Sequence, residues 1–545
     1  MKIRIHQLVV PLDYEARDII SAAAGRLGLP VDALSEVTIL RRSVDARKRR
    51  GEPVFVFSIE VELSNDAPIR AGAQAEILPD AAPEAAEAPV AAAPHASAGS
   101  LGSRRVVVVG AGPAGLMAAL TLAEAGLAPL LIERGQAVEQ RIGQVGRFWQ
   151  DGTLDIESNA LYGEGGAGLF SDGKLTSRSK DRSRARKLLE TLVRCGAPAD
   201  ILIEADPHLG SDVLTRIVPA WRHLITSAGG EVRFNARLDG VEIDDGKLVA
   251  VHVGAERIET AACVLATGHS ARDVYRMLHK SGVTLEAKAF AIGVRAELTQ
   301  QRIDEAQFGR WAGHPRLGAA SFRLTRQAMG AARPCYTFCT CPGGVVISCA
   351  SASGMMTTNG MSLAARDGKW GNAAFLVPVS PTDFPSPDAD NPSELAGVAF
   401  QAEIERKAFQ AGGADYSLPA ARLTDFLGGE TGDKLPDDRS CRRSRQADLR
   451  TVLPEFVCQT LTEAMPRMLL KQRGVVLEEV TVYAAETRTS SPVRVVRGAT
   501  GESPAAAGLF PAGEGAGYAG GIVSSGIDGL HTAKRVLEML ALCHA

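Results

Sequence analysis

Residues 104–135 read RRVVVVGAGPAGLMAALTLAEAGLAPLLIERG, and this stretch decides the fold of the domain that contains it. The β-branched run at its start is typical of a buried parallel strand. The run leads into the glycine turn GAGPAG, and a helical stretch continues to about Ala125. A second apolar strand, residues 128–132, ends at Glu133. The stretch therefore predicts a strand, a tight turn, a helix and a second strand.

The spacing G-x-G-x-x-G gives each glycine of this turn its own task. Gly110 permits the turn, Gly112 lets a pyrophosphate approach the backbone, and Gly115 lets the helix pack closely on the strand. Pro113 stands near the first helical position, where its missing N–H costs little. Glu133 follows the last glycine by eighteen residues, where an acceptor for ribose hydroxyls is needed. We predict that the stretch binds an ADP moiety.

The whole chain has the composition of a globular protein. At 545 residues it is too long for one hydrophobic core, so we expect two large domains and a smaller unit. The formal net charge of −3 gives no overall attraction to nucleic acid or to anionic membranes. No apolar run of the sequence has the length of a membrane span, and the N-terminus is a poor signal peptide. Nine cysteines without an evident framework suit a reducing compartment, so we predict a cytoplasmic protein.

Residues 1–64 predict a small α/β module, and residues 65–103, rich in Ala and Pro, predict a linker that tethers it. The basic segment 47–50 is interpreted as a solvated hairpin loop, with a nucleic-acid or partner contact as the alternative. A tethered module of this kind is a candidate site for a partner protein. The expected strands of the module are 3–10, 37–43 and 54–63, and its helix is 13–27.

A glycine-rich stretch, YGEGGAGLFSDGKLTSRSKD at residues 162–181, follows the nucleotide fingerprint. Its glycines disfavour a regular helix and let backbone N–H groups approach a ligand. Tyr162, Leu169 and Phe170 are apolar anchors that a free surface loop would not need. We therefore predict that this stretch contacts a ligand rather than forming a flexible loop.

Further along, an apolar strand at 262–266 ends in Ala266-Thr267-Gly268 and is expected to return the chain to the nucleotide sheet. Residues 285–490 contain no second nucleotide fingerprint and predict a separate substrate domain. Residues 508–514, GLFPAGE, then run into a glycine turn, and 522–542 predict a helix whose N-terminus carries partial positive charge. Other expected helices are 182–192, 211–227, 392–411 and 448–470, and other expected strands are 231–234, 238–243, 248–253, 256–259, 289–296, 345–349 and 373–379.

The fingerprint, the 266–268 strand end and the 512–514 turn converge on one ligand. In this order they resemble the glutathione-reductase-type FAD-binding fold, over residues 104–275 and 500–545. The resemblance implies FAD, with Glu133 at the adenosine ribose, Glu514 at the ribityl chain and the last helix N-terminus at the flavin N1/O2 edge, where reduced flavin is negative. The cofactor-binding residues expected on this basis are Gly110, Gly112, Pro113, Ala114, Gly115, Glu133, Arg134, Gly166, Gly168, Leu238, Ala266, Thr267, Gly268, Gly513, Glu514, Gly520, Gly521 and Ile522.

Nearly the whole chain resembles a bacterial family of FAD-dependent dehydrogenases without an assigned substrate. The resemblance implies the cofactor and the reaction class. Because a second G-x-G-x-x-G is missing from the sequence, NAD(P)H as a reductant is expected to bind only transiently. The motifs that carry the resemblance are GEGGAG at 163–168 with SDGK at 171–174, CTCPGG at 339–344, NGMS at 359–362 and ETRTSSP at 486–492.

Four groups are candidates for catalysis. Arg488 and Arg494 flank a polar segment that returns towards the flavin, either to clamp a substrate carboxylate or to form an interdomain ion pair. Lys174 and Asp172 are an acid and base pair for flavin or substrate, or a solvated pair. His269, a lone histidine after a strand end, is expected to have no catalytic role.

Four cysteines, Cys335, Cys339, Cys341 and Cys349, are spaced C-x₃-C-x-C-x₇-C. This spacing is unlike that of metal ligands, so we predict no metal site. A redox-active thiol near the flavin and ordinary core cysteines remain the two interpretations, and the second is favoured.

The predicted fold class is α/β. A discontinuous Rossmann-like FAD-binding domain, 104–284 and 491–545, carries an inserted α+β substrate domain, 285–490, and follows the N-terminal module. The predicted function is FAD-dependent hydride transfer between flavin N5 and a small, anionic organic substrate, without a membrane partner. The alternative, which we consider less favoured, is an RNA-acting flavoenzyme or a flavin-containing RNA-binding module. It rests on the basic segments 47–50, 180–187 and 439–445.

Overall fold

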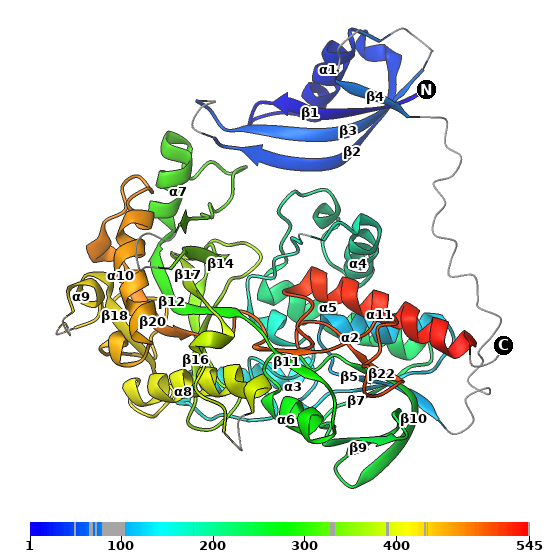
Figure 1. Cartoon of the computed structure of the whole chain (residues 1–545). Coiled ribbons are helices and arrows are strands. Elements are labelled where there is room, and N and C mark those ends of the chain that lie inside the picture. The colour runs from blue at the N-terminus through cyan, green and yellow to red at the C-terminus, as the bar shows by residue number, and fades with distance from the viewer. Residues whose placement is uncertain are drawn as a thin grey trace.

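The computed structural model describes residues 1–47, 51–64, 69–70, 74–78, 104–177, 179–327, 333–388, 392–429, 432 and 434–542. Within them the strands form a sheet of four, two sheets of seven and two ribbons of two strands. Figure 1 shows the two large sheets side by side in one body, with the four-stranded sheet above them. No helix among these residues has both the length and the apolar composition to cross a membrane.

The nucleotide sheet has the order β7-β6-β5-β10-β9-β8, with β22 beside β10. Strands β5, β6, β7, β10 and β22 run parallel, and β8 and β9 extend the sheet as an antiparallel meander. The expected strands 256–259 and 262–266 are one strand, whose first half pairs with β9 and whose second half pairs with β5. The bounds are β5 Arg105–Val109, β6 Leu130–Ile132, β7 Glu231–Arg233, β8 Gly240–Asp244, β9 Lys247–Val253, β10 Glu256–Leu265 and β22 Leu509–Pro511.

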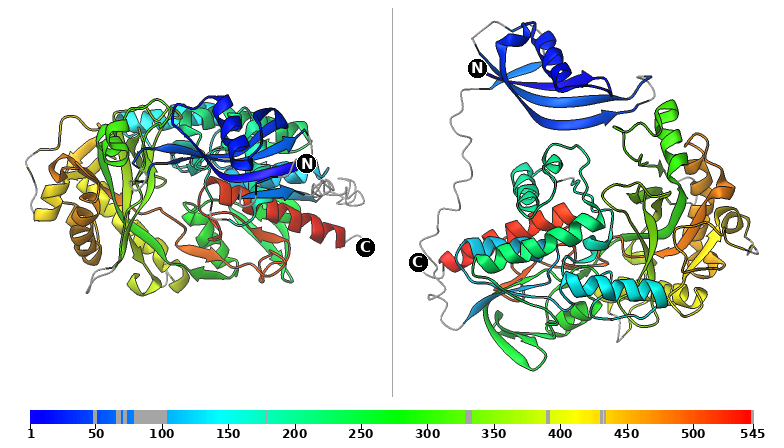
Figure 2. Two further views of the ribbon diagram at one scale, coloured as in Figure 1. Left: turned by 90° about the horizontal axis from the view of Figure 1, so that it is seen from above. Right: turned by 180° about the vertical axis from the view of Figure 1, so that it is seen from behind.

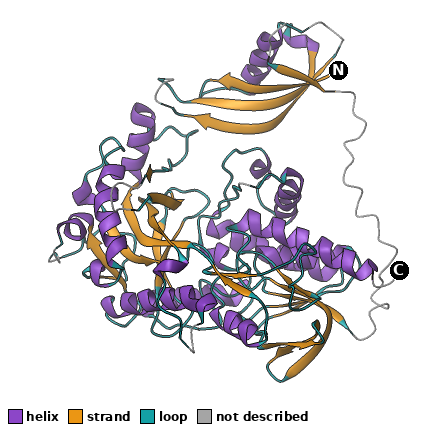
Figure 3. Cartoon of the chain, viewed as in Figure 1, coloured by secondary structure: helices purple, strands orange, loops and turns teal. Residues whose placement is uncertain are grey.

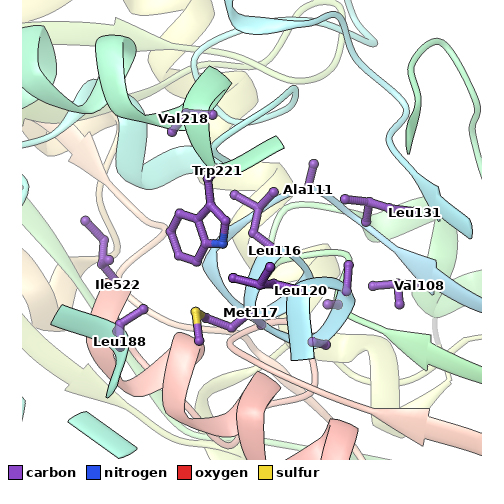
Figure 4. Close-up of a cluster of buried hydrophobic side chains, with 14 of the residues drawn as sticks. Val108, Ala111, Leu116, Met117, Leu120, Leu131, Leu188, Val218, Trp221 and Ile522 are labelled. Atoms are coloured by element: carbon purple, nitrogen blue, oxygen red, sulfur yellow. The ribbon is translucent and has the colours of Figure 1, made fainter. Parts of the chain in front are cut away.

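Four helices lie on one side of this sheet, purple in Figure 3: three of them contact its strands, and the fourth, α4, packs on the other helices. They are α2 (Pro113–Glu124), α4 (Arg182–Arg194), α5 (Gly210–Ser227) and α11 (Ile522–Leu542). In Figure 4 the Trp221 ring lies among Leu116, Met117 and Leu188, which joins α5, α2 and α4 in one apolar cluster. α6 (Arg272–Lys280) contributes to the apolar cluster on the other face, and α3 (Val138–Asp151) follows β6.

The substrate-domain sheet has the order β13-β14-β17-β12-β20-β18-β19. Its bounds are β12 Phe290–Thr299, β13 Thr325–Arg326, β14 Cys335–Cys341, β17 Trp370–Val379, β18 Leu418–Arg422, β19 Ser444–Gln446 and β20 Thr481–Glu486. The helices of this part of the chain are α7 Gln300–Phe308, α8 Ala396–Ala411, α9 Leu423–Gly428 and α10 Glu455–Leu469. The two ribbons pair β15 (Val345–Cys349) with β16 (Thr357–Met361), and β11 (Leu285–Ala287) with β21 (Val493–Val495).

Two expected helices of the substrate domain begin later than the sequence predicted. The helix expected over 448–470 begins at Glu455, because Pro454 has extended backbone and serves as its N-cap. The helix expected over 392–411 begins at Ala396, after a 3₁₀ turn.

The N-terminal module is a sheet of order β2-β3-β1-β4 with one helix packed on it. Its elements are β1 Lys2–Val10, α1 Ala16–Leu27, β2 Leu34–Asp45, β3 Val54–Leu63 and β4 Ala75–Leu78. β4 lies inside the stretch predicted as linker, and it is an edge strand paired with β1, so the linker prediction is wrong for residues 75–78. Residues 65–68, 71–73 and 79–103 of that prediction, and the basic residues 48–50, lie outside the described residues.

The module is docked on the body as well as tethered to it. Arg42 in β2 donates its backbone N–H to Ile203 O at 2.7 Å, and Ala205 donates its own N–H to Arg42 O at 2.9 Å. The Arg42 guanidinium also binds Glu204 at 2.9 Å. Figure 2 shows from behind that the sheet of the module faces the two larger sheets along β2.

We expect Arg42→Glu to undock the module, because the new carboxylate would face Asp200 and Glu204. The amide of Ala205 should then exchange its hydrogen at least about tenfold faster, measured by hydrogen exchange and mass spectrometry. Arg41→Glu, at the exposed neighbouring position, is the control and should leave this exchange unchanged. Equal protection of Ala205 in Arg42→Glu would contradict the docking.

Two of the three fingerprint glycines, Gly110 and Gly115, perform the structural tasks that the sequence predicted for them. A Cβ on Gly115 would overlap the carbonyl oxygen of Gly110, so α2 lies against the end of β5 with no room for a side chain. Gly110 has a φ of 100°, in the region that favours glycine.

We predict that Gly115→Ala lowers the free energy of unfolding of the FAD-binding domain by about 3 kcal/mol, since α2 must move off β5. Chemical denaturation followed by flavin release would measure this loss. Gly143→Ala is the matched control: Gly143 lies in α3 and is exposed, and a Cβ added there would meet no described atom within 4 Å. It should stabilise slightly through helix propensity. Equal stability of the two variants would overturn the steric argument.

Candidate functional site

One cavity brings together the three elements that the sequence predicted to share a ligand. The turn between β5 and α2, the strand end after β10 and the start of α11 line it, and the substrate-domain sheet closes it. Gly115 does not line the cavity and serves the packing of α2 instead. The predicted cofactor residues that do line it are Gly110, Gly112, Pro113, Ala114, Glu133, Arg134, Gly166, Gly168, Leu238, Ala266, Thr267, Gly268, Gly513, Glu514, Gly520, Gly521 and Ile522.

Glu133 binds the backbone of the glycine turn and of the glycine-rich loop. Its carboxylate accepts the backbone N–H of Ala111 at 2.8 Å, of Gly135 at 2.9 Å and of Gly163 at 3.1 Å. An ionised carboxylate has about four acceptor positions, so one remains for a ribose hydroxyl. Glu133 therefore joins the glycine turn to the glycine-rich loop, and its contact with the adenosine ribose stays a prediction.

Arg141, which the sequence analysis missed, holds the glycine-rich loop. It is fully buried and donates to the carbonyls of Asn159 at 2.9 Å, Glu164 at 2.7 Å and Gly166 at 3.0 Å. The loop approaches the fingerprint so closely that a Cβ on Gly166 would lie 3.1 Å from Gly112 Cα. The loop thus has a fixed place on the cavity wall.

The end of the cavity that was predicted to hold the flavin is the N-terminus of α11. The first N–H groups of a helix have no backbone partner within it, so this end carries partial positive charge. Of the groups that precede Ile522, the Gly520 N–H donates to Ser524 Oγ at 3.0 Å. Nearby, burial raises the pKa of Glu514 to about 7, against the opposing effects of the Gly521 N–H and the Lys288 charge. One cavity is lined by the glycine turn, by Glu133 and by the N-terminus of α11. The residues present therefore fit an FAD.

Lys174 is placed at this cavity by the glycine-rich loop. Its ammonium donates to the carbonyl of Thr340 and to Thr340 Oγ1 at 2.8 Å, and it lies 4.0 Å from Asp172 Oδ2. Asp172 is buried and held by Arg366, whose Nε lies 2.9 Å from Oδ1, and by Ser362. Asp172 is therefore committed to Arg366, and Lys174 is the member of the expected pair that is available to a ligand.

Of the two interpretations of Arg488 and Arg494, the contacts of both side chains show the ion pair. Arg488 lines the cavity, but its Nε and Nη2 each bind Glu405 at 2.9 Å and its Nη1 binds Ser351 at 2.7 Å. The fork that would hold a substrate carboxylate is thus occupied by Glu405. Arg494 lies outside the cavity lining, is 43% exposed and pairs with Glu286 at 3.4 Å. The ion-pair interpretation describes both residues.

A second buried pair that the sequence analysis missed forms the opposite wall. Arg295 on β12 binds Glu486 on β20 at 2.9 Å, and its other nitrogens bind Asn372 at 2.8 Å and Asn359 at 3.1 Å. Glu486 and Asn359 line the cavity. Glu486 belongs to the ETRTSSP motif and Asn359 to the NGMS motif. Arg295 lies in the largely apolar strand β12, where no neighbouring residue indicates a functional role.

The cysteines separate into two kinds. Cys339 and Cys341 line the cavity, whereas Cys335 and Cys349 are buried away from it. Burial raises the pKa of Cys341 to about 11, so its thiol is neutral at pH 7. Cys339 is exposed. No cluster of metal-binding side chains occurs in the part of the chain that the structure describes. His269 also lines the cavity, and burial with the nearby Arg488 and Arg272 charges lowers its pKa to about 4.

Comparison with known proteins identifies three segments. Residues 104–301 match the family model described as pyridine nucleotide-disulphide oxidoreductase, and 289–489 match FAD-dependent protein, C-terminal domain-like. Residues 2–62 match a domain of unknown function. An uncharacterized protein of Clostridium beijerinckii is 40% identical over 546 residues, which cover 99% of this chain and 100% of the relative.

Solved structures of flavoproteins resemble the chain more distantly. The halogenase PltM in complex with FAD is 11% identical, with a TM-score of 0.38 over 81% of this chain and 70% of that chain. The glycerol-3-phosphate dehydrogenase of Bacillus halodurans, complexed with FAD, is 10% identical, with a TM-score of 0.34 over 82% and 66%. NikD, an amino acid oxidase, is 15% identical, with a TM-score of 0.31 over 80% and 94%.

The buried cluster around Glu405 gives a pH-dependent stability. Burial alone would raise the pKa of Glu405, but the Arg272 and Arg488 charges bring it to about 2, below the ordinary 4.5. A carboxyl group with a lowered folded pKa stabilises the fold above its ordinary pKa and loses this contribution as the pH falls towards 2. Glu405→Gln should therefore cost about 3–5 kcal/mol near pH 7, and the difference from wild type should shrink below about pH 4.5.

Denaturation midpoints between pH 3 and pH 7 measure this difference. Glu403→Gln in the same helix is the control, because Glu403 pairs with Lys407 at the surface, and it should change stability by less than about 1 kcal/mol. A constant difference across the pH range would show that Glu405 is not ionised in the folded protein.

Proposed function

This chain belongs to the family of the Clostridium beijerinckii protein and is an FAD-dependent oxidoreductase; we propose that it transfers a hydride between a small organic substrate and flavin N5. The observation that carries the proposal is the single cavity in which the nucleotide elements face a polar wall of the substrate-domain sheet. FAD, when bound, supplies the atom that accepts or returns the hydride.

The polar wall favours a substrate with an anionic or carbonyl oxygen. Arg134 and Arg488 already bind carboxylates, Arg134 at 2.7 Å from Glu157. Lys174 instead donates to a carbonyl and a hydroxyl of Thr340, neutral acceptors that a negatively charged ligand oxygen can replace. Lys174 thus takes over the part that was predicted for Arg488 and Arg494, which is to hold the substrate oxygen. It keeps the part that was predicted for Lys174 itself, which is to exchange a proton with flavin or substrate.

Glu486 and Asn359 orient the other side of the substrate. Arg295 binds both, so their positions are fixed before a ligand arrives. Glu486 is buried and keeps its carboxylate paired, which leaves its remaining lone pairs for a substrate hydroxyl or amine. A preorganised wall of this kind lowers the entropy cost of binding.

The RNA-acting alternative has no support in the site. Among the described cations of the basic segments, several are used within the chain: Arg47 pairs with Asp45 at 2.7 Å, Arg186 with Glu190 at 2.7 Å and Arg445 with Asp415 at 2.9 Å. A partner protein at the N-terminal module and a cytoplasmic location stay predictions.

An absorbance spectrum of the purified protein, followed by anaerobic addition of NADH or NADPH, tests the proposal first. Flavin bands that bleach would support NAD(P)H as a transient reductant that leaves the cavity after transfer. Bands that persist with NAD(P)H and bleach with a small acid or alcohol would identify the substrate as the donor. Bands that no small organic molecule or NAD(P)H bleaches would contradict hydride transfer.

We expect Lys174→Met to lower kcat/KM by about 10- to 100-fold, the value of one charge-assisted hydrogen bond, with FAD content unchanged. Flavin reduction followed by stopped flow measures the loss once the donor is known. Lys180→Met, an exposed lysine in the following segment, is the control and should behave as wild type. An unchanged rate in Lys174→Met would remove Lys174 from the substrate site.

A further inference from the structure

We propose that the N-terminal module positions Lys174 at the cavity through the strap, residues 203–209, and that Arg42 is the positioning residue of the module. The strap runs between the module and the glycine-rich loop and is hydrogen-bonded to both. The proposal rests on the substrate role proposed for Lys174, and it gives the module a part in the reaction although the module lies outside the cavity lining.

The first half of the strap is bound to strand β2 of the module. The Arg42 N–H donates to Ile203 O at 2.7 Å, and the Ala205 N–H donates to Arg42 O at 2.9 Å, which makes a parallel bridge between Arg42 and Glu204. The Arg42 guanidinium adds bonds to Glu204 at 2.9 Å and to Asp200 at 3.0 Å. The backbone and the side chain of one residue thus hold this end of the strap.

The second half of the strap is bound to the backbone on both sides of Lys174. The Leu175 N–H donates to Pro207 O at 2.9 Å. The Leu209 N–H donates to Gly173 O at 3.1 Å. These bonds join the residue before Lys174 and the residue after it to the strap, so the position of the Lys174 backbone depends on the strap.

The connection between the two ends is short and stiff. Pro207 has its own φ fixed at about −65° by the proline ring, and it restricts Asp206, the residue before it, to extended backbone. Pro207 and Leu209 are buried. A displacement of Ala205 is therefore transmitted to the residues that are bonded to the loop of Lys174.

The module has a second contact with the body, which makes it a fixed support for the strap. The Arg316 guanidinium donates to the carbonyls of Tyr14 at 2.5 Å and Leu12 at 3.3 Å. Trp311 and Leu317 pack against the apolar cluster of the module. Because the module is held at two separate places, it cannot rotate freely about the strap.

The placement of Lys174 matters because its ammonium lies between two kinds of partner. It donates to Thr340 Oγ1 at 2.8 Å and lies 4.0 Å from Asp172 Oδ2. A shift of the loop by about 1 Å would change both distances, and a misplacement of this size can cost about 100-fold in rate. Groups that support a site from behind its lining are therefore needed to keep the geometry productive.

Hydrogen exchange of the FAD-containing full chain tests the coupling without a substrate. Arg42→Glu should make the amides of Leu175 and Leu209 exchange at least about threefold faster, because the strap loses its support. Arg42→Lys keeps the positive charge and should retain most of the protection. Arg41→Glu, at the exposed neighbouring position, is the control and should leave both amides at the wild-type rate.

Arg42→Pro is the second variant, for the case that Arg42→Glu leaves the module docked. It removes the guanidinium and also the N–H that binds Ile203, and β2 is an edge strand, where proline is tolerated. Faster exchange at Ala205 with unchanged exchange at Leu175 and Leu209 would overturn the proposal. Wild-type protection of these amides in both variants would overturn it as well.

A double-mutant cycle then tests whether Arg42 acts through Lys174. Arg42→Glu should lower kcat/KM by about 3- to 10-fold with FAD content unchanged, and by less than about 2-fold when Lys174 is already replaced by Met. An equal loss in both backgrounds would overturn the positioning of Lys174. If Lys174→Met alone turned over like wild type, the substrate role of Lys174 would fail, whereas the exchange at Leu175 would still report on the strap.

Discussion

The cavity exists because one buried carboxylate joins the two large sheets. Glu405 on α8 accepts Arg272 from α6 at 2.8 Å, Arg488 from the segment after β20 at 2.9 Å and Thr487 at 2.8 Å. α6 belongs to the nucleotide domain, and the other elements belong to the substrate domain, so the cluster fixes how the two domains meet. Removing the carboxylate charge would leave two buried guanidinium groups without their partner, which is energetically costly. This cost favours the one arrangement of the two domains in which all three groups meet.

The parts of the site that the sequence predicted are those whose physical cause is local. Gly115 is required by a contact with Gly110, five residues away, and Gly110 by its own backbone conformation, with a φ of 100°. Ile522 begins its helix where a glycine turn ends. Such causes leave a spacing that can be recognised in one chain. The start of the helix expected from residue 448 was predicted wrongly, although its cause is also local. Pro454 is the N-cap of a helix that begins at Glu455, and the sequence analysis did not use this proline.

The parts that could not be predicted depend on contacts between distant residues. Arg295 and Glu486 are 191 positions apart, and Arg272 and Glu405 are 133 apart. Arg488 was correctly expected near the cavity. Its role as an ion-pair partner depends on Glu405, which belongs to no recognisable sequence motif. An edge strand such as β4 is equally hidden, because its pairing with β1 is set by the module and its composition resembles that of the linker around it.

The balance of charge in the cavity constrains the chemistry that it can support. Arg134, Arg295 and Arg488 are each neutralised by a carboxylate, so they shape the walls without adding free positive charge. What remains is the ammonium of Lys174, which Thr340 and Asp172 hold, and the N-terminus of α11. These positive groups suit an anionic edge of the cofactor or of a substrate. Arg488 was expected to bind substrate, but Glu405 occupies its guanidinium, so the cavity offers an anion the Lys174 ammonium rather than a guanidinium fork.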